Sequence, residues 1–87
     1  MMTKHEVTRM TTMLAMTKAL DKVLTILADP TLTEEEAAIN WHHAEMLCEI
    51  LGLLGRREYV KAMEVHKLLV NSIDAAHLYL GTVRGTP

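Results

Sequence analysis

Histidines are the residues of this sequence with the greatest chemical capacity, and three of the five fall on apolar helix faces. In a helix each residue turns by about 100°. On this basis His43 lies in the middle of the apolar arc of a predicted helix over residues 34–54, and His66 and His77 lie on the apolar arc of a predicted helix over residues 57–80. Buried polar groups need hydrogen-bond partners. We therefore expect neutral imidazoles that pair with each other, with Thr17 or with water, and antiparallel helices would place His43, His66 and Thr17 in one polar layer.

The same histidines support two alternative interpretations. In the first, His43, His66 and His77 bind a metal ion together with Asp74, because Asp74 and His77 have the i, i+3 spacing used in helical bundles that hold two metals. Such bundles draw carboxylates from four helices, whereas this chain supplies one such pair, so we favour no cofactor. In the second, histidines that titrate near neutral pH make an interface sensitive to pH.

Enzymatic activity is not expected from the remaining reactive residues. A cysteine nucleophile needs a neighbouring histidine base, and the single cysteine, Cys48, falls on the opposite side of its helix from the His43 arc. The chain also contains no glycine-rich phosphate loop. The sequence therefore predicts a protein that is not an enzyme.

The composition favours binding to another protein. Hydrophobic residues make up 49% of the 87 residues, and they spread beyond one face of each predicted helix. In the predicted helix over residues 34–54, Trp41 lies opposite the apolar stripe. In the predicted helix over residues 57–80, a second apolar line is formed by Val65, Leu68 and Tyr79. Exposed apolar patches mark interfaces, and Trp and Tyr are frequent anchors there. We predict a protein-interaction module, a homodimer that binds or regulates another protein through these four residues.

Arg56 and Arg57 form a small basic pair that we add to the predicted partner-binding surface. The formal net charge of −2 creates no positive field for nucleic acid. A helix-turn-helix would also need a polar recognition helix, and residues 57–80 are apolar over too wide an arc. Nucleic-acid binding is therefore the lowest-ranked function.

The sequence predicts a cytoplasmic location. No uncharged apolar run reaches the roughly 18 residues of a membrane span, and the first residues lack the apolar stretch of a signal peptide. A single cysteine cannot form an internal disulfide, which suits a reducing compartment.

Apolar residues at alternating spacings of three and four predict three helices, over about residues 4–28, 34–54 and 57–80. The apolar stripe of the third helix is Tyr59, Met63, Val70 and Ile73, and we expect these side chains to face the core. Short connections make neighbouring helices antiparallel. We expect an all-α, three-helix antiparallel bundle that pairs into a larger helical assembly. Residues 1–81 would form a single helical domain, followed by a flexible tail over 82–87.

Local signals mark the predicted helix ends. The Asp29-Pro30 step ends the first helix, because a residue before proline leaves the α region. Thr33 and Glu36 have the spacing of a capping box at the start of the second. Gly55 and Gly81 are the predicted terminators of the second and third helices.

One stretch resembles a single tetratricopeptide-type helical hairpin, in its residues Ala44, Leu47, Leu51, Gly55, Tyr59 and Ala62. The spacing from Gly55 to Ala62 is two residues longer than in that pattern. Repeat proteins also need about three units to bury a core, and only one is present. The stretch therefore predicts a generic helical hairpin.

Overall fold

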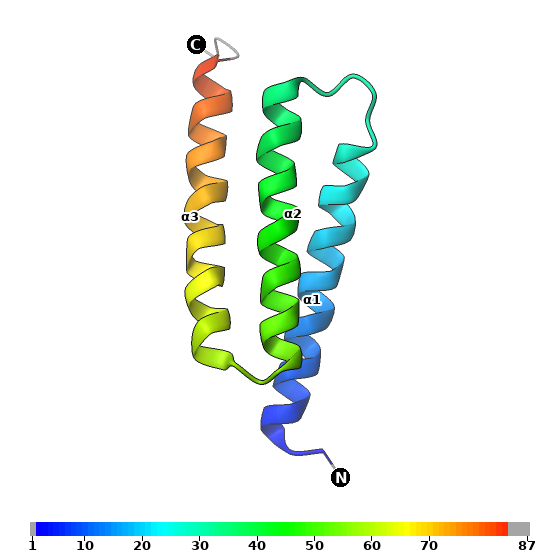
Figure 1. The fold of residues 1–87 in the computed structure, drawn as a ribbon, viewed down its shortest axis with the longest axis vertical. Coiled ribbons are helices and arrows are strands. Elements are labelled where there is room, and N and C mark those ends of the chain that lie inside the picture. The colour runs from blue at the N-terminus through cyan, green and yellow to red at the C-terminus, as the bar shows by residue number, and fades with distance from the viewer. Residues whose placement is uncertain (1, 84–87) are drawn as a thin grey trace.

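The computed structural model describes residues 2–83, with side chains to Leu80, and this part of the chain contains three α-helices. These helices are α1 (Lys4–Leu27), α2 (Glu34–Gly55) and α3 (Tyr59–Val83). They run antiparallel, and α2 stands between the other two (Figure 1). The predicted all-α fold with three antiparallel helices is confirmed.

Helix α2 carries the core, because both other helices pack on it. Seven of its side chains are buried, and five of these form one cluster with Ala62 and Leu69 of α3. Helix α1, all of whose side chains are described, contains none that is fully buried. It contributes half-buried side chains to the cluster, namely Met13, Met16, Ala19, Leu20 and Val23.

Helices α1 and α3 do not pack on each other. Over their described lengths, no Cα atom of α1 lies within 8 Å of a Cα atom of α3. The molecule is elongated along its helices, with extents of 52 × 23 × 18 Å and a radius of gyration of 15.1 Å (Figure 1). A compact domain of this length would have a radius of gyration of about 12 Å. Much apolar surface therefore stays uncovered.

Threonine side chains cap the first two helices. The Thr33 hydroxyl accepts the Glu36 backbone N–H at 3.1 Å and donates to Glu36 Oε1 at 3.0 Å, so the predicted cap is confirmed. Thr3 accepts the Glu6 N–H at 3.2 Å in the same position of α1. Each cap satisfies one of the backbone donors that a helix leaves free at its first turn.

The predicted role of Gly55 as the terminator of α2 is wrong. Gly55 remains helical, and the left-handed residue that ends the helix is Arg57, with φ of 60°. The N–H of Glu58 donates to the Leu53 carbonyl at 2.9 Å, and the N–H of Arg57 donates to the Leu54 carbonyl at 3.1 Å. These bonds define a Schellman motif with Arg57 at the position where glycine is usual.

The ends of α3 also differ from the prediction. The helix begins at Tyr59 because the preceding left-handed turn occupies Arg57. It continues through Gly81 to Val83, since a single glycine costs a helix only about 1 kcal/mol relative to alanine. Residues 84–87 of the predicted tail lie outside the described residues.

Candidate functional site

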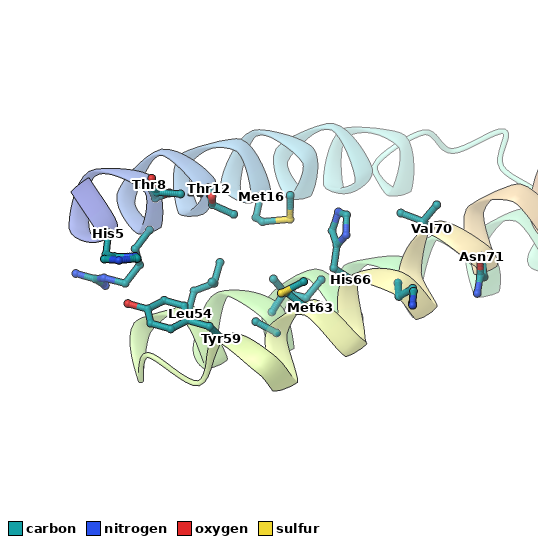
Figure 2. Close-up of a pocket in the computed structure, with 14 residues that line it drawn as sticks. His5, Thr8, Thr12, Met16, Leu54, Tyr59, Met63, His66, Val70 and Asn71 are labelled. Carbon is teal, nitrogen blue, oxygen red and sulfur yellow. Dashed lines mark hydrogen bonds between the residues drawn. The ribbon is translucent and has the colours of Figure 1, made fainter. Parts of the chain in front are cut away.

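A groove runs along α2 between α1 and α3, because those two helices stay apart (Figure 2). Its volume is about 540 Å³. Ile50 and Leu54 of α2 lie between the two walls. The α1 wall is formed by His5, Thr8, Arg9, Thr12 and Met16, and the α3 wall by Tyr59, Ala62, Met63, His66, Lys67, Val70 and Asn71.

The apolar side chains of the α3 wall were predicted to be core residues, and the structure corrects this. Tyr59, Met63 and Val70 are all exposed, Met63 by 72%. They share an apolar stripe with residues that pack on α2, but they lie toward the flank of that stripe, where α1 would have to cover them. Since α1 does not reach α3, these side chains line the groove instead.

The charged side chains that line the groove have the same sign. They are Arg9 of α1 and Lys67 of α3, and the imidazoles of His5 and His66 lie beside them on the two walls. No carboxylate occurs among the described residues that line it. The groove thus combines apolar walls with basic side chains, which suits an apolar ligand that carries negative charge.

An ion-pair cluster joins α1 to the turn between α2 and α3. Glu6 accepts from Arg9 at 2.8 Å and from Arg57 at 3.1 and 3.3 Å. Hydrogen bonds from Arg9 and then Arg57 lower the pKa of Glu6 to about 2. Two guanidinium groups share this one carboxylate, so the cluster keeps one positive charge.

This cluster changes the interpretation of the basic pair predicted to bind a partner. Arg57 is held within the molecule by Glu6, and Arg56 pairs with Glu58 at 2.9 Å. Both arginines are exposed. Their visible role is to organise the turn and to connect it to α1.

His43 is the one polar residue in the buried set of the described chain, as its position on the apolar arc predicts. Its Nε2 atom lies 3.2 Å from Ser72 Oγ of α3. Burial lowers the pKa of His43, and the nearby His42 and His77 lower it further. The sequence analysis missed Ser72 because the two residues are 29 positions apart, and only the helix register brings them together.

The predicted polar layer of His43, His66 and Thr17 is wrong. His66 is exposed and lies on the groove wall. The Thr17 hydroxyl donates to the Met13 carbonyl of its own helix at 2.8 Å. Element ends read from a sequence are uncertain by several residues, which is enough to rotate a layer out of register.

The alternative metal site has no assembled ligand set in the described part of a single chain. No three side chains of His, Cys, Asp or Glu type come close enough there to hold a metal ion. Asp74 and His77 are both exposed, whereas His43 is buried against Ser72.

The remaining predicted interface residues lie on two helices. Trp41 of α2 and Leu68 and Tyr79 of α3 are exposed. The Tyr79 hydroxyl donates to Glu35 Oε2 at 3.0 Å, and this bond raises the pKa of Tyr79. Val65 differs from the prediction, because it is half-buried and packs against the core cluster.

Comparison with known proteins adds no assignment to this geometry. No family model matches the chain, and neither a curated protein nor a solved structure matches it. Among the described residues, no helix combines the length and the apolar character needed to cross a membrane.

Proposed function

We propose that this protein is a non-enzymatic helical interaction module, which binds protein surfaces through apolar side chains that its own chain leaves uncovered. The observation that carries the proposal is the separation of α1 and α3. Because each of them packs only on α2, a groove and a series of large apolar side chains remain open to solvent. Exposed apolar patches of this kind mark interfaces.

The solvent-accessible surface area shows how much more surface the chain exposes than a globular monomer of its mass. The chain exposes 6495 Å² for a mass of 9.8 kDa, whereas a monomeric globular protein of that mass exposes about 5200 Å². The excess is larger than the roughly 800 Å² that each partner contributes to a standard interface. One standard protein–protein contact would therefore cover more than half of this excess, and it would leave the rest for a second contact.

We further propose that a second copy of the chain covers the line of Leu68 and Tyr79 on α3. Lys61 lies two helical turns and Glu64 one turn before Leu68 on the same side of the helix, and the two side chains have opposite charges. In a two-fold dimer the same patch meets itself, so Lys61 of one copy can approach Glu64 of the other. Trp41 of α2 extends the apolar surface available for such a contact.

The test is the oligomeric state of the full chain. Light scattering should give a dimer for the wild type and a monomer for Leu68→Glu. Met63→Glu is the matched control, because Met63 is an exposed apolar residue of the same helix that lies in the groove. A monomeric wild type, or a dimer that survives Leu68→Glu, would refute the homodimer.

We place this activity in the cytoplasm and expect it to be regulatory or inhibitory. A reducing compartment keeps the exposed thiol of Cys48 free. A module that only binds alters its partner by covering a surface or by holding it in place. Capture of a protein partner by the wild type from cytoplasmic extract, with loss of that partner in Met63→Glu, is the expected result.

A further inference from the structure

We infer that the groove between α1 and α3 binds one amphipathic α-helix of a partner protein, whose apolar stripe is bordered by carboxylates. This inference rests on the proposed interaction function and specifies its binding site and the chemistry of the partner. The groove is distinct from the Leu68 and Tyr79 line assigned to the second copy.

The shape of the groove fits a helix. It is flanked by α1 and α3, which run parallel to each other and antiparallel to α2, so a fourth helix laid along it would complete a four-helix arrangement (Figure 1). His66 and Val70 point from α3 toward α1, and Met16 lies on the facing wall (Figure 2). Apolar side chains at i, i+3, i+4 and i+7 of an incoming helix would enter this space.

The charge of the groove selects the partner. His5, Arg9, His66 and Lys67 line it, and no carboxylate does so within the part of the chain whose side chains are described. Arg9 already pairs with Glu6 at 2.8 Å, and because Arg57 shares the same carboxylate, this cluster keeps one net positive charge beside the α1 wall. A carboxylate is the acceptor that complements a guanidinium. Acidic residues beside the apolar stripe would therefore pair with both walls.

A second copy of this chain is a poorer occupant of the groove. Groove-to-groove pairing would place the same basic side chains of two copies against one another, and like charges across an interface are costly. Insertion of a different helix of one copy into the groove of the next would be head-to-tail, and such contacts lead to rings or open filaments. A helix from another protein avoids both problems.

A small anionic amphiphile is also a poorer fit. Ligand sites for small molecules bury most of the ligand surface. Here α1 and α3 stay apart along their described lengths, so one side of the groove remains open. An extended, self-supporting ligand such as a helix uses this length and tolerates the open side.

The test uses two designed helical peptides and the full chain. Both peptides carry leucine at the i, i+3, i+4 and i+7 positions, and they differ only in having glutamate or lysine beside the stripe. Fluorescence anisotropy should show that the glutamate peptide binds at least about tenfold more tightly than the lysine peptide, a difference of about 1.4 kcal/mol. Added salt should weaken the glutamate peptide more.

Three variants locate the site. Met63→Glu should weaken the glutamate peptide at least about tenfold. Lys67→Glu should weaken the glutamate peptide and strengthen the lysine peptide. Leu68→Glu is the matched control on the same helix and should leave peptide affinity unchanged. Met63, Lys67 and Leu68 are exposed, so the variants should fold, which circular dichroism verifies.

The results separate this inference from the proposed homodimer. Equal affinity for both peptides, or no effect of Lys67→Glu, overturns the charge selection. Peptide binding that survives Met63→Glu overturns the site. Binding of a fluorescent fatty acid that Met63→Glu abolishes, without binding of either peptide, identifies an amphiphile and overturns the helix. In each of these cases the light-scattering result for Leu68→Glu still decides the homodimer independently.

Discussion

Two adjacent leucines of α3 provide a sharp test of the open architecture. Leu69 is 4% exposed and belongs to the core cluster, whereas Leu68 is 60% exposed. The change Leu→Ala removes the same atoms at both positions and has the same small effect on helix propensity. Any difference in stability between Leu69→Ala and Leu68→Ala therefore reports how much of each side chain the fold covers.

The expected difference is large relative to the stability of the protein. A leucine buried to this degree costs about 2–5 kcal/mol when it becomes alanine, through lost transfer energy and the cavity left behind. The whole domain should have a free energy of unfolding of roughly 4–13 kcal/mol. Leu69→Ala should thus remove a substantial share of the stability and lower the Tm by about 10 °C or more. Leu68→Ala should cost about 0.5 kcal/mol or less in the monomer.

The assay is urea unfolding followed by far-ultraviolet circular dichroism at several protein concentrations. In the proposed dimer the second copy would cover Leu68, so the cost of Leu68→Ala should grow with protein concentration. The cost of Leu69→Ala should be present at every concentration. Equal costs for the two variants in dilute, monomeric protein would show that Leu68 is covered by its own chain, and the reasoning from an uncovered α3 would fail.

Three further predictions concern charge and backbone geometry. Glu6→Gln should lower the Tm above pH 4.5, where the carboxylate is ionised in both folded and unfolded chains, and thermal melts should show this loss disappearing as the pH falls to about 2. Wild-type protein should lose stability as the pH falls below 6.5, because the unfolded His43 then binds a proton that the buried ring, with its lowered pKa, resists; in urea unfolding, His43→Gln should reduce this dependence and His66→Gln, at an exposed position, should preserve it. Arg57→Gly should be more stable than Arg57→Ala by about 1 kcal/mol. Both variants lose the guanidinium, but glycine adopts the left-handed conformation of this position without steric cost, whereas alanine does not. Equal stabilities would contradict the strain at this turn.

The helices themselves follow from local rules. Each cap joins residues three positions apart, as in the bond from Glu36 N–H to Thr33 Oγ1. The apolar spacing that predicts a helix likewise involves residues within one or two turns. These interactions do not depend on the rest of the molecule, so the predicted helix positions differ from the observed ends by at most three residues.

The turn at Arg57 shows where local rules begin to fail. Glycine is the usual left-handed residue, and Gly55 is two positions away. The structure nevertheless places Arg57 in that conformation, where its guanidinium meets Glu6, a residue 51 positions earlier in the chain. A contact between distant segments accompanies the departure from the local preference.

The sequence by itself determined three amphipathic helices, the Thr33 cap, a buried His43 and an apolar surplus. Only the tertiary structure decided which part of each broad apolar arc meets a neighbour. The physical reason is that an arc wider than one helix contact can be buried at several rotations and registers, and their energies depend on all the partners at once. That choice pairs His43 with Ser72, keeps α1 away from α3, and turns Tyr59, Met63 and Val70 from expected core residues into the wall of a groove.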